Sequence, residues 1–74
     1  MTRLPMLTPK KILQALERGG FELDHSRGSH LYLLHPLTHR ATTIAIHSGD
    51  ISRGLLKEII KQAGLTENQF RKLI

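Results

Sequence analysis

Histidine is the residue type in this sequence that is best suited to catalysis or metal binding. Five of the 74 residues are histidines: His25, His30, His35, His39 and His47. Imidazole exchanges protons near neutral pH and is also a common metal ligand. Side chains of one strand share a face only at even separations, whereas the first three histidines are five residues apart. With no cysteine, no HxH and no HExxH pattern, the sequence predicts neither a metal site nor a cofactor and favours proton transfer.

Two of these histidines, His30 and His47, are expected on one face of a sheet. Apolar and other residues alternate in the segments 30–35 and 40–47, as they do in strands packed on one side. If the apolar residues face the helices, His30, Tyr32 and His47 lie together on the opposite face, with Leu34 beside them. The apolar residues expected to face the helices are Leu31, Leu33, Ile44 and Ile46.

A histidine on an open, basic sheet suits cleavage of RNA, because RNA carries its own nucleophile, the 2′-hydroxyl. The enzyme needs a base for that hydroxyl, positive charge for the phosphate and help for the leaving oxygen. The six acidic residues are scattered along the chain, so the carboxylate cluster of a two-metal nuclease is not indicated. The spacing shows no serine–histidine–acid triad and no glycine-rich phosphate loop. From periodicity alone, an ordinary surface or half-packed role is the better interpretation of each single histidine.

The charge of the chain favours an anionic partner. Eleven Lys and Arg against six Asp and Glu give a formal net charge of +5 and an isoelectric point of about 10.3. Such a surface attracts nucleic acid or an acidic protein, although it also keeps a small protein soluble. Arg53, Lys57 and Lys61 are four residues apart and form a stripe on one expected helix. That stripe fits a phosphate backbone and a solvated helix face about equally well.

The elements that must position these residues follow the order α-β-β-β-α-α. Thr8 and Pro9 are typical of a helix start, and two glycines at 19 and 20 end that helix. Short links between the three strands favour an antiparallel sheet. The expected ranges are a helix over 9–18, strands over 21–25, 30–35 and 40–47, turns at 26–29 and 36–39, a loop at 48–50, a helix ending near 63 and a short helix beginning after Thr66.

The expected fold is therefore α+β, a single small domain over residues 1–74. Two helices lie across one face of the three-stranded sheet and leave the other face open. Asp50 or Ser52 caps the second helix, and Gly54 in its first turn is costly enough to indicate a close approach to the backbone there. Apolar runs are far shorter than the roughly 20 residues of a membrane span, and the start lacks a secretory pattern. We expect a soluble, cytoplasmic protein with no membrane partner.

Four segments of the chain resemble the HicA family, the toxin half of HicA–HicB toxin–antitoxin systems. The stretch 28–36, GSHLYLLHP, is similar to the Gly-Ser-His signature of that family and the strand it begins. The segments 19–21 (GGF), 43–47 (TIAIH) and 54–65 (GLLKEIIKQAGL) are similar to it in order and spacing. The likeness covers roughly residues 10–74, nearly the whole chain.

The resemblance implies a fold like that of a double-stranded-RNA-binding domain and an endoribonuclease activity that cleaves mRNA without a metal and halts translation. It also implies a HicB-like antitoxin that covers the active face. The histidine of the family's Gly-Ser-His motif is catalytic, which makes His30 the expected catalytic residue here. The other residues expected at the site are His47, Tyr32 and Ser29 as supporting groups, Gly28 as the turn residue, and Arg27, Lys57 and Lys61 as contacts to RNA phosphates.

Two other functions stay open on the sequence. A non-catalytic RNA-binding module of the same fold needs the basic face but not His30. A helix-turn-helix DNA-binding protein, built from 53–63 and 66–74, is the less favoured alternative, because the first of these helices is expected to pack in the core and the three strands have no part in such a motif.

Overall fold

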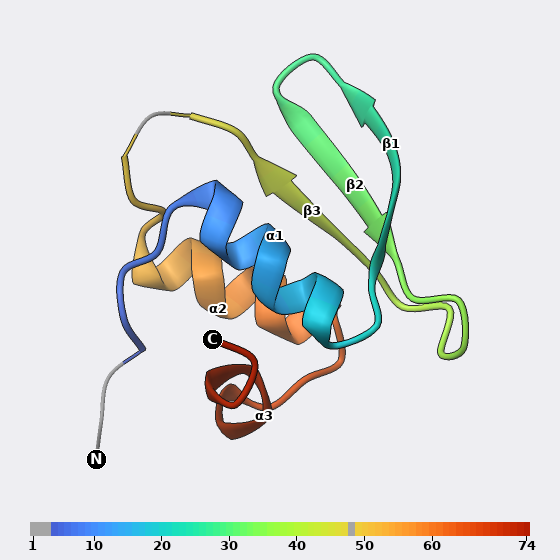
Figure 1. Ribbon diagram of the computed structural model, residues 1–74. Helices are drawn as coiled ribbons and strands as arrows, with labels where there is room; N and C mark the ends of the chain where they lie inside the picture. Colours follow the sequence, from blue (N-terminus) through green and yellow to red (C-terminus); the bar gives the residue numbers. More distant parts are fainter. Residues whose placement is uncertain (1–3, 48) are drawn as a thin grey trace.

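The protein is an α+β domain in which two helices pack against a three-stranded antiparallel sheet (Figure 1). The computed structural model describes residues 4–47 and 49–74. The order α-β-β-β-α-α predicted from the sequence is confirmed. The elements are α1 (Pro9–Arg18), β1 (Glu22–Arg27), β2 (His30–Leu34), β3 (Ala41–Ala45), α2 (Arg53–Gln62) and α3 (Glu67–Arg71).

Helix α1 begins and ends where its sequence predicts. The Thr8 hydroxyl accepts a hydrogen bond from the amide of Lys11 at 3.3 Å, and Pro9 occupies the first turn, where its missing N–H costs nothing. The chain leaves the helix through Gly20, whose φ of 97° is easily adopted only by glycine. Ile12 and Leu16 are fully buried and turn one side of α1 into the core.

The sheet has the strand order β1-β2-β3, so β2 is its central strand. On the face toward the helices, Leu31 pairs with Ile44 and Leu33 with Thr42. Leu33, Ile44 and Thr42 are buried there, which confirms the expected alternation in β2 and β3. Ile46 follows the end of β3 and is 47% exposed, but it lines a hollow with Pro9 and Leu13 of α1, so it lies on the side of the helices as predicted. The buried hydroxyl of Thr42 lies within hydrogen-bond distance of acceptors on α2.

Strand β1 differs from its prediction in extent, burial and phase. All six of its residues are exposed, whereas a half-buried strand over 21–25 was expected. Its pairing with β2 shifts between Leu23, which pairs with Leu33, and His25, which pairs with Tyr32, so that Asp24 is the extra residue of a β-bulge. The bulge reverses the alternation of the side chains. His25 therefore lies on the open face, although strict alternation places it on the same side as Leu23.

Helix α2 begins after Ser52, whose hydroxyl accepts a hydrogen bond from the amide of Leu55 at 3.2 Å. Of the two expected caps, Ser52 is therefore right and Asp50 is wrong. A Cβ placed on Gly54 meets no atom within 4 Å, so the described chain does not approach this glycine closely. The expected loop at 48–50 contains Ser48, which lies outside the described residues.

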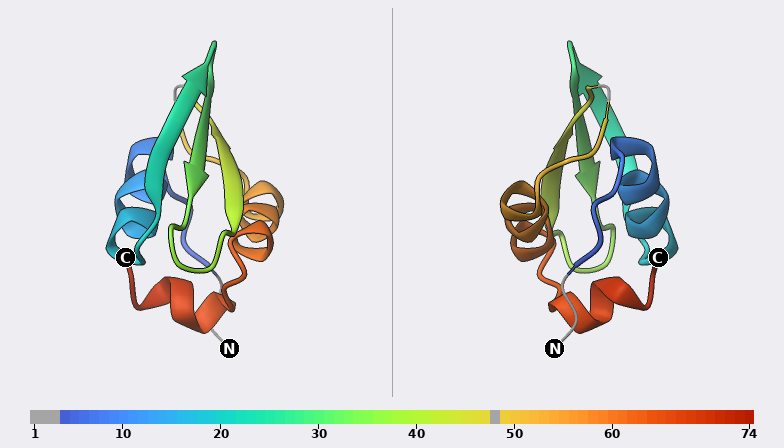
Figure 2. Two further views of the ribbon diagram at one scale, coloured as in Figure 1. Left: turned by 90° about the vertical axis from the view of Figure 1, so that its right-hand side faces the viewer. Right: turned by 90° about the vertical axis from the view of Figure 1, so that its left-hand side faces the viewer.

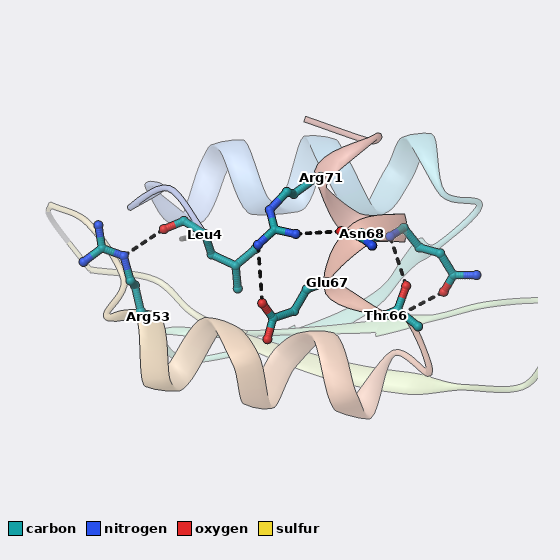
Figure 3. A network of polar contacts seen from close by, with 7 residues as sticks. Leu4, Arg53, Thr66, Glu67, Asn68 and Arg71 are labelled. Carbon is teal, nitrogen blue, oxygen red and sulfur yellow. Dashed lines mark hydrogen bonds and ion pairs between the residues drawn. The ribbon is translucent and has the colours of Figure 1, made fainter. Parts of the chain in front are cut away.

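Figure 2 shows the short helix α3 below α1 and α2, and residues 4–8, the N-terminal segment, running between those two helices. Thr66 and Gln69 form a complete capping box, as the sequence predicts. Figure 3 shows Arg71 reaching Asn68 at 2.8 Å within α3, and Arg53 donating from Nε to the carbonyl of Leu4 at 2.8 Å. The contact of Arg53 holds the N-terminal segment against α2.

The core lies between the helices and the sheet, and both α1 and α2 pack against β3 (Figure 2). As expected, no helix of the described residues lies on the opposite face of the sheet (Figure 2). The largest fully buried side chains are Leu4, Ile12, Leu16, Leu33, Ile44, Ile51, Leu56, Ile59 and Phe70.

Candidate functional site

His30 is placed on the open face by the tight turn that precedes it. Arg27 ends β1 and pairs with His30, the first residue of β2, so Gly28 and Ser29 form a two-residue turn. Gly28 has a φ of 57°, a backbone conformation that glycine adopts at no steric cost. The Ser29 carbonyl accepts a hydrogen bond from the amide of Ile46 at 2.6 Å, which ties the turn to the chain after β3. The backbone thus fixes where His30 begins its strand.

The neighbours of His30 come from all three strands. Across the sheet, His30 pairs with Arg27 on one side and with Ala45 on the other. Directly opposite residues project to the same face, so the guanidinium of Arg27 and the imidazole of His30 share the open face. His30 is exposed, and within the described residues its side chain has no hydrogen bond or ion pair. Its imidazole is therefore available to a ligand.

Helix α2 extends beyond the edge of β3 and forms one wall of a hollow beside His30. This hollow has a volume of about 190 Å³. Its floor comes from the sheet and its wall from the side of α2 that bears Leu55, Glu58 and Gln62. The residues that line it are His30, Thr43, Ala45, Leu55, Glu58, Ile59 and Gln62.

A second hollow of about 360 Å³ continues from the first along the sheet. Thr43 and Gln62 line both hollows, which together we call the open-face groove. His30 lies toward one end of the groove, and Asp24, His25 and Tyr32 lie toward the other. The remaining residues that line the second hollow are Leu33, Leu34, Ala41 and Thr42.

Sequence reasoning missed His25 and Asp24 as candidate site residues. The His25 Nδ1 atom lies 2.7 Å from a carboxylate oxygen of Asp24, and the imidazole stacks on the ring of Tyr32 with a centroid distance of 4.4 Å and an angle of 9°. The bulge at Asp24 is responsible, because it turns His25 toward Tyr32. A single sequence contains no signal that predicts a bulge at that position.

Of the three expected supporting residues, Tyr32 lies in the groove, and the structure brings neither His47 nor Ser29 into it. Tyr32 lines the second hollow, with one face of its ring covered by His25. Ser29 contributes its backbone carbonyl, which accepts the hydrogen bond from the amide of Ile46. His47 is exposed two residues beyond β3 and does not line either hollow.

The expected phosphate contacts separate into two groups. Arg27 lies on the open face beside His30. Lys57 and Lys61 are exposed on α2 but do not line the groove, whose wall is formed by other residues of that helix, Glu58 among them. Arg53, at the start of the stripe, is engaged with the Leu4 carbonyl. Of the three expected phosphate contacts, Arg27 alone lies beside His30. The phosphate contacts of the two lysines stay a prediction.

His35 has a structural position in the turn after β2. Its Nδ1 atom accepts hydrogen bonds from the amides of Leu37 and Thr38 at 3.2 and 3.3 Å, and its ring meets Phe21 edge-on at 5.1 Å. A Cβ on Gly20 would lie 2.7 Å from Nε2 of the same ring. His35 thus joins the turn between β2 and β3 to the corner between α1 and β1.

Three further observations concern the alternatives. Within residues 4–47 and 49–74, no three His, Asp or Glu side chains are grouped as metal ligands. No helix in the part of the chain that the structure describes is long and apolar enough to cross a membrane. Helix α3 has five residues and buries Phe70 in the core, which gives a helix-turn-helix little recognition surface.

Comparison with known proteins assigns the chain to a family. No curated protein matches the chain. The family model described as the HicA toxin of bacterial toxin–antitoxin systems matches residues 9–65, which include α1, the whole sheet and α2. This match covers well over half of the 74 residues. This chain, in which an exposed histidine follows a Gly-Ser turn, therefore belongs to the HicA family, the toxins of bacterial toxin–antitoxin systems.

Proposed function

We propose that this toxin is an endoribonuclease that cleaves mRNA in the cytoplasm, and so inhibits translation and growth, with His30 as its catalytic histidine. One observation carries the proposal. His30 is exposed on the open face beside a groove, with Arg27 directly opposite it in the sheet. A proton-transfer group and a fixed cation thus lie side by side, as cleavage next to a phosphate requires.

The proposed reaction uses the 2′-hydroxyl of RNA as the nucleophile. The 2′-oxygen attacks the adjacent phosphorus, the bond from phosphorus to the 5′-oxygen breaks, and a cyclic phosphate and a 5′-hydroxyl result. His30 moves a proton at one of these two oxygens, and Arg27 offsets the charge of the phosphate. Because the nucleophile belongs to the substrate, this route requires no metal ion.

The shape of the site supports a polymeric substrate. The groove lies along the surface of the sheet and includes residues of β1, β2, β3 and α2. A chain of nucleotides can follow such a groove, with phosphates near Arg27 and a base near Tyr32. The same exposed face is the one we propose a HicB-like antitoxin covers, since blocking access to His30 would stop cleavage.

The decisive experiment incubates the purified protein with RNA in the presence of EDTA and compares His30→Ala with wild type. We expect cleavage products with wild type and none with His30→Ala, although the variant folds normally because His30 is exposed. His39→Asn is the matched control: it also removes an exposed histidine, and asparagine tolerates the φ of 62° found there.

Other outcomes would redirect the assignment. Full cleavage and full growth inhibition by folded His30→Ala would contradict the catalytic role. A salt-sensitive gel shift without products, unchanged by His30→Ala, would favour a non-catalytic RNA-binding module. Preference for duplex DNA over RNA would favour a DNA-binding protein.

A further inference from the structure

We propose that His25, held by Asp24, is a second catalytic residue that protonates the leaving 5′-oxygen while His30 accepts the proton of the 2′-hydroxyl. This inference rests on the proposed ribonuclease function and extends it. One imidazole cannot easily serve both oxygens, because they lie on opposite sides of the reacting phosphorus. The structure provides a second imidazole on the same face.

The position of His25 follows from the bulge in β1. Leu23 pairs with Leu33 on the side of the helices, and the extra residue Asp24 shifts the following pairing so that His25 lies opposite Tyr32. Bulges of this kind re-aim side chains and are frequent beside active sites. Here the bulge adds a histidine to the face that already carries His30.

The orientation of His25 is fixed by two contacts. The carboxylate of Asp24 can only accept a hydrogen bond, so the 2.7 Å contact requires a proton on Nδ1 of His25. The stacked ring of Tyr32 holds the plane of the imidazole. Nε2 has no hydrogen bond within the described residues and is left to exchange a proton with a substrate. Both side chains of the pair are about half exposed, at 56% and 55%, so solvent screens the pair and its main effect is orientation.

The two histidines are diagonal neighbours on the open face. Tyr32 is the direct partner of His25, and His30 lies two residues before Tyr32 on the same face. Diagonal neighbours of this kind lie roughly 7–8 Å apart in an antiparallel sheet. Both histidines line the open-face groove, whose two hollows share Thr43 and Gln62. A phosphate bound between them can meet one imidazole on each side.

The proton balance assigns a role to each histidine. Neutral His30 takes the proton of the 2′-hydroxyl as the 2′-oxygen bonds to phosphorus. His25 begins as an imidazolium whose Nδ1–H is oriented by Asp24, and it gives its Nε2 proton to the 5′-oxygen as the phosphorus–oxygen bond breaks. Asp24 is a positioning residue in this scheme, since it acts through His25.

The test compares two substrates: an RNA oligonucleotide that wild type cleaves, and the same oligonucleotide with sulfur in place of the 5′-bridging oxygen at the cleaved linkage. Sulfur leaves without being protonated. We expect His25→Ala to cleave the normal RNA ~10²-fold or more slowly, the range of a lost general acid, and the sulfur-linked RNA within a few-fold of wild type. His30→Ala is expected to lose activity on both substrates.

Asp24→Asn provides a second, milder variant, because it keeps the size of the side chain and removes its charge. We expect a loss of about tenfold or more on the normal RNA, as for other groups that orient a reacting side chain, with little loss on the sulfur-linked RNA. His39→Asn is expected to match wild type on both. Near-normal activity on the sulfur-linked RNA also shows that His25→Ala, Asp24→Asn and His39→Asn are folded.

Three outcomes would overturn the inference. Cleavage of normal RNA by His25→Ala at the wild-type rate would show that His25 is not needed, while inactive His30→Ala would leave the proposed function standing. Equal losses on both substrates would assign His25 and Tyr32 to stacking on an RNA base. If wild type cleaves no RNA, or His30→Ala cleaves normally, the proposed function fails and the inference fails with it.

Discussion

Three glycines allow the cost of adding one methyl group to be measured in three different surroundings. Gly20 combines a φ of 97° with a Cβ position 2.7 Å from the His35 ring. Gly28 has a φ of 57°, and no atom of the described residues lies within 4 Å of its Cβ position. Gly54 lies in α2, also in open space. Substitution of each by alanine therefore separates close contact, backbone strain and helix propensity.

The expected magnitudes differ in size and in sign. Gly28→Ala carries only the left-handed backbone cost, about 1–2 kcal/mol of lost stability. Gly20→Ala carries a similar cost and also displaces His35, whose two hydrogen bonds to backbone amides are each worth about 1 kcal/mol. We therefore expect a loss of about 3–4 kcal/mol. Gly54→Ala should stabilise the protein by about 1 kcal/mol, because alanine is the better helix former.

Urea denaturation followed by circular dichroism gives these differences, and melting temperatures give a second reading at roughly 4–8 °C per kcal/mol for a domain of this size. The contact with His35 is isolated by repeating Gly20→Ala in a His35→Ala background. There its cost should fall to about that of Gly28→Ala. An equal cost of Gly20→Ala in both backgrounds would refute the argument that His35 occupies the space beside Gly20.

Three shorter predictions concern RNA binding and stability. Arg27→Gln should weaken RNA binding and lower the salt slope by about 1, whereas Lys57→Gln should change both less, which a gel-shift titration at several salt concentrations measures. Thr42→Val removes a buried hydroxyl 3.2 Å from the Ile59 carbonyl and should cost about 1 kcal/mol in urea; an unchanged midpoint would contradict that bond. Thr66→Ala removes the capping box of α3 and should cost about 0.5–2 kcal/mol, read as a lower melting temperature.

The sequence predicts the elements well where one local signal dominates. Thr8 and Pro9 start α1, and Thr66 with Gln69 starts α3, because hydroxyl caps and proline act on their own turn of backbone. The alternation in β2 and β3 also predicts the open face correctly, since Leu33 and Ile44 must be buried. His30 is on that face for the same reason.

The sequence does not predict the partners that depend on register across strands or on the placement of a helix. A bulge at Asp24 depends on how β1 meets β2, and it alone brings His25 to the open face. Likewise, the side of α2 that closes the groove depends on where the helix crosses β3. That placement puts Glu58 at the groove, whereas the charge pattern of the helix predicts Lys57 as the residue near the substrate.

The exposure of every residue in β1 separates the chemistry of this strand from the stability of the domain. The core is complete without its side chains, so most substitutions there should change the free energy of unfolding by no more than about 0.5 kcal/mol. Substitutions in this strand therefore change the side chains at the groove without unfolding the domain. Randomising Glu22, Leu23 and Ser26 would vary this strand on one folded scaffold while the proposed roles of Asp24, His25 and Arg27 are kept.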